Sequence, residues 1–181
     1  MSSKKRKQKI NDEGNKVKYL DNTAILDYVS ENRIMQQSLV LIKKILHDEK
    51  CKERNLKFTD ELALNLDKVE IEMKKGTSSE ESKTVDFVIG LENRLLLLVE
   101  AKFDAKNMDN VAREMPKKIK HSKEILVGNT KFIDLYHKTI ILLSSDNFEQ
   151  NKTRLLNQLC NNTAYSPMNV KEFYSSFFEK R

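Results

Sequence analysis

Two apolar segments separated by a three-residue turn constrain the fold of this chain more than any other feature. Residues 85–91 are rich in Val, Phe, Ile and Leu, and residues 95–103 begin with four leucines and a valine. Runs this uniformly apolar predict strands that are covered on both faces. The polar turn at 92–94 is short enough to fold them into an antiparallel hairpin. We therefore expect the centre of a sheet in the middle of the chain.

The segments before this hairpin change from a helical to an alternating pattern. Apolar residues recur at helical spacing from Thr23 and again from Glu31 to about His47, which predicts two helices or one kinked helix. Leucines alternate with other residues over 62–66, and apolar and charged residues alternate over 69–74. These two stretches predict short strands, the second of them half exposed.

The segments after the hairpin predict helices around one more buried strand. A helix is expected with Pro116 in its first turn and Gly128 at its end. Residues 139–143 form a further apolar run, and helices are expected at 151–160 and 170–180. A helix between two buried strands predicts a parallel crossover. The predicted class is α/β, with a mixed central sheet flanked by helices.

The charge balance favours an anionic partner. Lys and Arg outnumber Asp and Glu by 33 to 27, a formal net charge of +6 over 181 residues. Nucleic acid is the commonest partner of a basic protein, although a small net charge can also serve only solubility. Residues 1–18 are expected to form a basic, disordered tail, and residues 19–181 a single domain. The lack of a secretory signal or a long apolar run predicts a cytoplasmic location without membrane contact.

Three charged residues stand where an apolar sheet is predicted. Glu100 and Lys102 are two apart on one strand, so they project from the same face, and Asp86 interrupts the preceding strand. Reflecting Glu100 about the turn centre at Asn93 gives position 86, so Asp86 and Glu100 should lie side by side across the hairpin. Two adjacent carboxylates repel each other unless a cation or a proton lies between them.

This arrangement predicts a divalent-metal site. Hard carboxylate ligands on a rigid sheet suit Mg²⁺ or Mn²⁺, and Lys102 can orient a water molecule or stabilise a negatively charged transition state. Such a site can hydrolyse a phosphodiester bond. The alternative is a buried ion pair in which Lys102 only neutralises Asp86 or Glu100.

The segments Val85-Asp86 and Val99-Glu100-Ala101-Lys102 resemble the PD-(D/E)XK nuclease superfamily, although Val85 stands where the family name has proline. The resemblance covers about residues 20–145. It implies a restriction-endonuclease-like αβββαβ core, metal-dependent cleavage of DNA or less often RNA, and a backbone carbonyl of Ala101 that completes the metal shell. Many members add a carboxylate from the first helix, for which Glu31 is the candidate; otherwise Glu31 only favours the helix dipole.

Basic residues near the expected site are candidates for nucleic-acid binding. Arg113, Lys117 and Lys120 follow helical spacing, Lys118 widens the stripe, and Lys106 flanks it. The alternative for these residues is a solvated helix face.

The leading hypothesis is therefore a Mg²⁺- or Mn²⁺-dependent endo- or exonuclease with Asp86 and Glu100 as metal ligands and Lys102 as a catalytic residue. A non-catalytic nucleic-acid-binding or protein-interaction domain on the same fold is the second hypothesis, and an unrelated α/β interaction protein is the third. A chain of this size leaves little room beyond the core, so a homodimer or a partner protein is compatible with each hypothesis.

Overall fold

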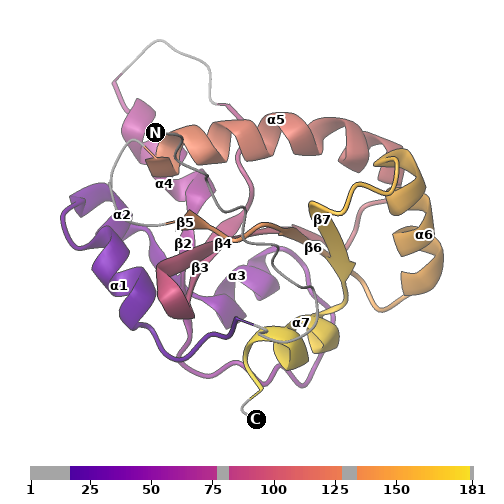
Figure 1. The fold of residues 1–181 in the computed structure, drawn as a ribbon, viewed down its shortest axis with the longest axis horizontal. Coiled ribbons are helices and arrows are strands. Elements are labelled where there is room, and N and C mark those ends of the chain that lie inside the picture. The colour runs from indigo at the N-terminus through magenta and orange to yellow at the C-terminus, as the bar shows by residue number, and fades with distance from the viewer. Residues whose placement is uncertain (1–16, 77–81, 128–133, 180–181) are drawn as a thin grey trace, which may run out of the picture.

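The computed structural model of the chain describes residues 17–76, 82–127 and 134–179. These residues form an open, mixed sheet of seven strands with helices on both faces (Figure 1), which confirms the predicted α/β class. The helices are α1 (Thr23–Val29), α2 (Arg33–Gln37), α3 (Ile42–Asp48), α4 (Leu66–Lys74), α5 (Met108–Val127), α6 (Phe148–Gln158) and α7 (Val170–Phe177). The strands are β1 (Leu39–Leu41), β2 (Leu62–Asn65), β3 (Phe87–Leu91), β4 (Leu95–Lys102), β5 (Asp134–Leu135), β6 (Thr139–Leu143) and β7 (Tyr165–Met168).

The sheet combines an antiparallel half with a parallel half. Its strand order is β1-β2-β3-β4-β6-β7, and β5 also pairs with β4. Strands β1 to β4 run antiparallel to their neighbours, whereas β4, β6 and β7 run parallel to one another. Helix α5 connects β4 to the parallel β6, so the predicted crossover is confirmed.

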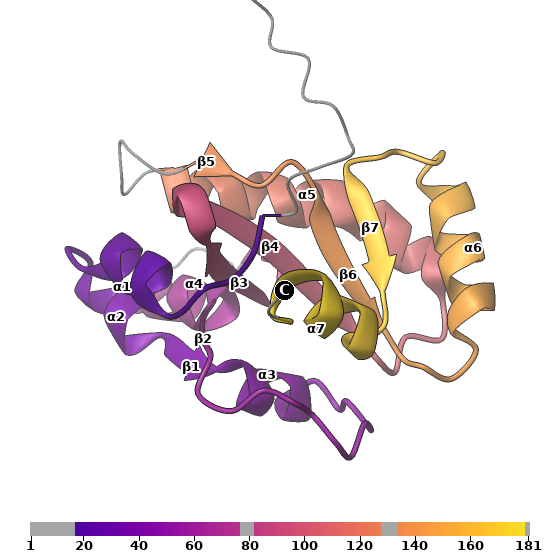
Figure 2. The same cartoon turned by 60° about the horizontal axis from the view of Figure 1, so that its bottom comes forward.

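Each face of the sheet has its own apolar core. One face packs against α1, α5 and α6, and the other packs against α3 and α7 (Figures 1 and 2). Along β4, Leu96 and Leu98 belong to the first core, whereas Leu97 and Val99 belong to the second. The two faces of β4 are therefore both covered, as its uniformly apolar sequence predicts.

A tight turn fixes the register of the β3–β4 hairpin. Residues Glu92–Arg94 form a single 3-10 turn in which Asn93 and Arg94 have positive φ angles of 60° and 57°. Leu91 pairs with Leu95 at the turn, and Phe87 pairs with Val99 at the far end. This is the register predicted by reflection about Asn93.

The strand predicted over 69–74 is wrong, because these residues belong to helix α4. The helix begins where the Asn65 side chain caps it by accepting the backbone N–H of Lys68. Val69 and Glu70 are buried, whereas Ile71 and Met73 are exposed. The alternation of apolar and charged residues fits a strand, but the burial follows the helical period.

The helix predicted from Glu31 to His47 is also wrong, because strand β1 divides it into α2 and α3. The Ser38 hydroxyl donates to the carbonyl of Ile34, and the Ser38 carbonyl accepts the backbone N–H of Asn65. The next three residues then pair with β2, with Leu39 opposite Leu64. Pairing with a neighbouring strand outweighs the helical pattern of the sequence.

The helix start predicted at Pro116 is wrong, since α5 begins eight residues earlier and carries Pro116 inside it. A proline at this position removes one helical hydrogen bond. The apolar side of α5 compensates through buried residues such as Met108, Met115 and Leu126. Gly128, the predicted end of the helix, lies outside the described residues.

Strand β7 escaped sequence analysis because Pro167 lies within it. Proline lacks the N–H of a sheet ladder and is tolerated at an edge strand, which is the position of β7. The predicted helices at 151–160 and 170–180 correspond to α6 and α7, with α6 beginning at Phe148.

The predicted basic tail falls mostly on residues 1–16, which lie outside the described residues. The backbone of Lys18 donates to the Glu92 carboxylate and accepts from the Glu92 N–H, so the chain enters the domain beside the hairpin turn. Within 17–76, 82–127 and 134–179, no helix combines the length and the apolar character needed to cross a bilayer.

Close contact between β3 and α1 gives a test of the fold. A Cβ atom on Gly90 would lie 2.6 Å from the backbone nitrogen of Ile25, so we expect Gly90→Ala to lower the free energy of unfolding by about 3 kcal/mol or more. Gly76 is the control, because a Cβ there meets open space and only its φ of +81° is unfavourable. Gly76→Ala should cost about 1 kcal/mol in urea denaturation. Equal losses for the two variants would contradict this packing.

Candidate metal centre

The candidate centre lies where β3 begins and β4 ends. The register that pairs Phe87 with Val99 places Asp86 opposite Glu100 when it is continued by one residue. Asp86 shares the face of Val88, and Glu100 and Lys102 share that of Leu98, so all three charged residues lie on the α5 side of the sheet. The hairpin therefore brings together the three residues that the sequence singled out.

Hydrogen bonds on both sides hold Asp86 in place. Its backbone carbonyl accepts the N–H of Leu66, 3.1 Å away, and its Oδ2 accepts the N–H of Ala101 at 2.5 Å. The preceding residue, Val85, donates its N–H to the Ser122 hydroxyl on α5. Asp86 is thus fixed relative to α4, β4 and α5, and only 5% of it is exposed.

Glu100 is a fully buried carboxylate whose two oxygens have different surroundings. Oε1 lies 2.6 Å from the ammonium group of Lys102 and 2.6 Å from that of Lys118. Oε2 is also buried, and no group in the described part of the chain forms a hydrogen bond with it. A buried carboxylate oxygen without a partner is costly, so Oε2 has capacity for a further ligand.

The ammonium group of Lys102 bridges two of the expected metal ligands. It donates to the carbonyl of Ala101 at 3.0 Å and pairs with Glu100 Oε1. Burial opposes the charged form of Lys102, but the negative charges of Glu100 and Asp86 outweigh this effect and raise its pKa. Lys102 therefore stays charged and provides a cation at the centre.

The charges of these neighbouring groups also affect the pKa of Asp86. Burial and the nearby negative charge of Glu100 raise the pKa of Asp86 from 3.8 to about 8, although Lys102, Lys118 and the Ala101 N–H oppose the shift. The two carboxylates are thus close enough to repel each other. A carboxylate that is costly to ionise without a further cation is common at functional sites.

Glu49 is a further carboxylate that senses the charge of this centre, and the sequence analysis missed it. Burial raises its pKa, the charge of Lys102 opposes the rise, and the charges of Asp67 and Glu100 add to it. Glu49 follows the last turn of α3, where it continues the buried side formed by Ile42 and Ile45. This helical spacing was the signal that could have identified it.

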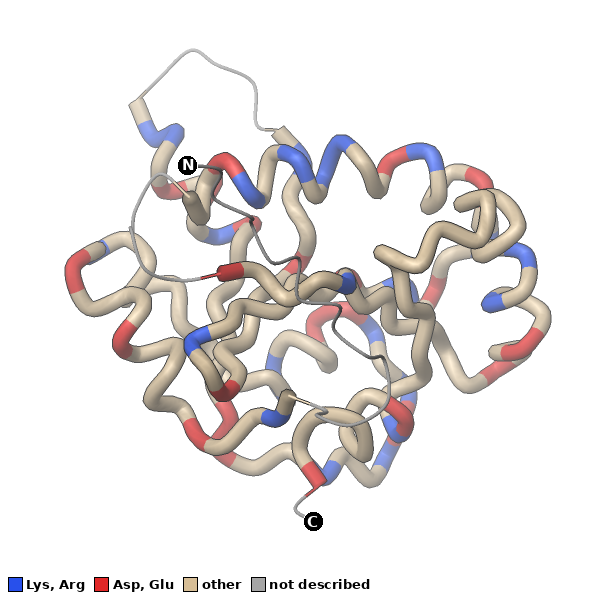
Figure 3. Tube along the Cα trace, viewed as in Figure 1, with Lys and Arg blue, Asp and Glu red and all other residues tan. Residues whose placement is uncertain are grey.

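Glu31, the other candidate acid, lies in an exposed turn between α1 and α2. Of the predicted nucleic-acid-binding residues, Lys106, Arg113, Lys117 and Lys120 are exposed. Lys118 differs from them, because it is buried and its ammonium group contacts Glu100. Figure 3 shows Lys and Arg residues recurring along α5.

The donor set suits a small divalent cation in part. Asp86, Glu100 and the carbonyl of Ala101 offer hard oxygen donors where β3 begins and β4 ends, and Glu100 Oε2 has no partner within the described ranges. No three carboxylate, imidazole or thiol side chains among the described residues converge closely enough to hold a metal by themselves. Water or substrate oxygens would have to complete the shell, which is common for Mg²⁺.

Comparisons with known proteins do not place the chain in a family. No family model matches it, and no curated protein or solved structure is detectably similar to it.

The charge repulsion at Asp86 gives a test that needs no ligand. Because the folded state holds the Asp86 proton up to a pH of about 8, whereas the unfolded state releases it near 3.8, ionisation makes the wild type less stable as the pH rises between these values. Asp86→Asn removes this loss and can still accept from Ala101. In urea denaturation with a chelator, we expect the variant to gain stability over the wild type from pH 5 to pH 8, by at most about 1.4 kcal/mol per pH unit.

Asp109→Asn is the control for this measurement. Asp109 is exposed, and a hydrogen bond from Arg154 lowers its pKa, so its replacement should remove a small stabilisation at pH 8. A gain of the same sign in both variants would show that net charge, not repulsion within the centre, causes the effect.

Proposed function

We propose that the chain is a metal-dependent nuclease that hydrolyses phosphodiester bonds, with DNA as the expected substrate. The observation that carries the proposal is the state of Glu100, which is fully buried, has one oxygen without a partner among the described residues and lies beside a second buried carboxylate. A core carboxylate pair of this kind is compatible with a bound cation more readily than with packing alone.

In this proposal, Asp86, Glu100 and the carbonyl of Ala101 hold Mg²⁺ or Mn²⁺. The bound ion supplies Lewis acidity, lowers the pKa of a water ligand and neutralises phosphate oxygens. The antiparallel hairpin positions Asp86 and Glu100 before any ligand arrives, because the backbone of β3 and β4 and the Ala101 N–H fix both residues.

Lys102 and Lys118 supply positive charge next to these ligands. Lys102 is about one-quarter exposed at its side chain, so its ammonium group can reach a phosphate oxygen or an attacking water. Lys118 is held against Glu100 from α5 and orients that carboxylate. We assign Lys102 as the catalytic lysine and Lys118 as a positioning residue.

The fold order supports the same proposal. Strands β2, β3 and β4 form an antiparallel meander, and α5 then leads to the parallel β6. This order is compatible with the αβββαβ order of a restriction-endonuclease-like core if α4, between β2 and β3, is counted as an addition together with β1, β5 and β7. Glu49, which follows α3 and whose pKa responds to the charges of Lys102 and Glu100, replaces Glu31 as the candidate for a further carboxylate from the N-terminal part of the chain.

One observation favours a second function. Lys102 and Lys118 already compensate the charge of Glu100 without a metal, as expected of a buried ion-pair network. On this alternative the chain is a non-catalytic nucleic-acid-binding or protein-interaction domain. The two functions differ in metal dependence.

Cleavage assays test the proposal directly. Wild-type protein should nick plasmid DNA or shorten labelled DNA or RNA in Mg²⁺ or Mn²⁺ and not in a chelator. Glu100→Gln should lower the rate by at least about 10²-fold, because it weakens metal binding, and Lys102→Ala by about 10²–10³-fold, because it removes a positive charge at the reacting phosphate. Glu172→Gln is the matched control, because Glu172 is a half-buried carboxylate that caps α7 on the other face of the sheet.

If the metal-dependent rate is unchanged in Glu100→Gln, the activity belongs to another site. If the wild type cleaves none of the substrates, the proposed nuclease function is wrong. Circular dichroism of each variant separates loss of activity from loss of folding. Glu100→Gln leaves Lys102 and Lys118 without their carboxylate partner. If this variant unfolds for that reason, Lys102→Ala still tests the centre.

Thermal unfolding separates the two functions without a substrate. A cation that binds only the folded state raises its stability by about 2.7 kcal/mol at roughly 100 times Kd. We expect Mg²⁺ or Mn²⁺ to raise the Tm of the wild type by several degrees and to leave that of Asp86→Asn almost unchanged. A bare ion-pair network predicts no metal-dependent shift in either protein.

A further inference from the structure

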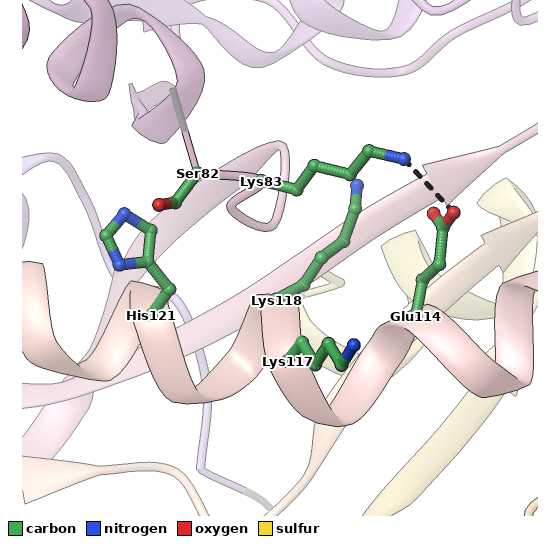
Figure 4. A pocket seen from close by; sticks show the side chains of 6 residues that line it. All are labelled: Ser82, Lys83, Glu114, Lys117, Lys118 and His121. Carbon is green, nitrogen blue, oxygen red and sulfur yellow. Dashed lines mark hydrogen bonds and ion pairs between the residues drawn. The ribbon is translucent and has the colours of Figure 1, made fainter. Parts of the chain in front are cut away.

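A pocket of about 440 Å³ lies next to the candidate centre and is not used by the proposed chemistry. Helix α5 contributes Glu114, Lys117, Lys118 and His121, which share one helical face, and the segment before β3 contributes Ser82 and Lys83 (Figure 4). The volume lies within the roughly 300–1,000 Å³ range of ligand sites.

Lys118 connects this pocket to the carboxylates. Its side chain lines the pocket, points from α5 toward the Lys83 segment in Figure 4, and ends 2.6 Å from Glu100 Oε1. A molecule in the pocket would therefore lie one side chain away from the proposed metal. If one anionic group of a polyanion lay at the proposed metal beside Glu100, the next anionic group along the polymer would be within reach of the pocket.

The pocket carries a net positive charge. Lys83, Lys117 and Lys118 line it, against the single carboxylate of Glu114. Lys117 is exposed and forms no ion pair with any carboxylate in the described part of the chain. His121 Nε2 lies 2.9 Å from Oε2 of the buried Glu70, and the same carboxylate accepts the N–H of Ser82, so Glu70 links the two residues on this side of the pocket.

The carboxylate of Glu114 already forms an ion pair with Lys83, where an anionic ligand could bind instead. Its Oε1 lies 3.0 Å from the Lys83 ammonium group, as the dashed line in Figure 4 marks. The hydrogen bond from Lys83 and the further charges of Lys118 and Lys102 lower its pKa, so the position stabilises negative charge. The Lys83 side chain is largely exposed and that of Glu114 is 41% exposed, and an ion pair with this access to water is weak enough for a stronger anion to displace.

We propose that this pocket binds a phosphodiester group of a nucleic-acid strand, next to the one at the carboxylates, and that Glu114 competes with it for Lys83. Lysine ammonium groups and a hydroxyl are suitable donors to phosphate oxygens. The ligand is a polyanion rather than a small acid because exposed basic residues continue along α5 beyond the pocket, at Arg113, Lys120 and Lys123. The inference rests on the proposed function for the identity of the ligand.

The two members of the Lys83–Glu114 pair should have opposite effects on binding. We would measure the affinity of the full chain for a fluorescein-labelled duplex in a chelator, over a series of salt concentrations. Lys83→Gln and Lys117→Gln should each weaken binding several-fold and reduce the slope of log Kobs against log[salt] by about 0.9, the value for one phosphate contact. Glu114→Gln should strengthen binding several-fold, because it frees Lys83.

The ion pair between Asp109 and Arg154 is the matched control. It is exposed, joins the first turn of α5 to α6, and has an N–O distance of 2.9 Å, close to that of the pair in the pocket. Asp109→Asn changes the net charge as Glu114→Gln does, and Arg154→Gln changes it as Lys83→Gln does. Both control variants should leave the slope of log Kobs against log[salt] unchanged. If Asp109→Asn strengthens binding as much as Glu114→Gln, net charge explains the effect and the proposal is wrong.

Two further outcomes would overturn the inference. If Lys83→Gln and Glu114→Gln both weaken binding, their ion pair has a structural role. If the effects appear only with a 5′-phosphorylated end and vanish with a 5′-hydroxyl end, the pocket holds a terminal phosphate and not a diester within the strand.

The binding assay is independent of cleavage. Because a chelator is present throughout, a chain without nuclease activity can still show the opposite effects of the Lys83 and Glu114 variants. Conversely, a chain that cleaves DNA through Glu100 can lack these opposite effects on binding. Failure of the pocket and failure of the proposed function are therefore distinguishable.

Discussion

The antiparallel pairing of β3 with β4 is the constraint on which the rest of the structure depends. It fixes Phe87 opposite Val99 and so brings Asp86 to Glu100. It also leaves the other edge of β4 available to the parallel β6, which α5 reaches by crossing one face. The charged end of the hairpin and the lysines of α5 meet because the same strand supports both connections.

The two oxygens of Glu100, at the middle of the charged centre, have unequal surroundings. Two ammonium groups contact Glu100 Oε1, while Oε2 has no partner in the part of the chain that the structure describes. Burial and Glu100 together keep the proton on Asp86 to a pH of about 8. A network that served only stability would gain from an apolar or neutral replacement of Asp86, which is consistent with the ligand that we propose for this centre.

The surroundings of the centre are asymmetric in a way that suits an extended anion. On one side, Lys118 leads from Glu100 into a pocket with Lys83 and Lys117. The charge of Lys102 also acts on Glu49, which follows α3 on the other face of the sheet. Acidic groups therefore gather around the proposed cation, and basic groups gather where the rest of a nucleic-acid strand would lie. The exposed Lys83–Glu114 pair gives this surface a contact that a phosphate can exchange.

The sequence by itself determined the hairpin, its register and the α/β class, because apolar strands joined by a three-residue turn leave few ways to pair. It also determined which charged residues enter the core, since Asp86, Glu100 and Lys102 interrupt those strands. Only the tertiary structure decided that β1 divides the helix expected from Glu31, because strand contacts at Ser38 outweigh local periodicity. Residues 69–74 form a helix that the Asn65 side chain caps locally, a signal that the alternating pattern concealed. The same holds for Lys118 and Glu49. Lys118 lies 18 residues from Glu100 and reaches it only after α5 packs across the sheet, and no local pattern encodes a contact of that kind.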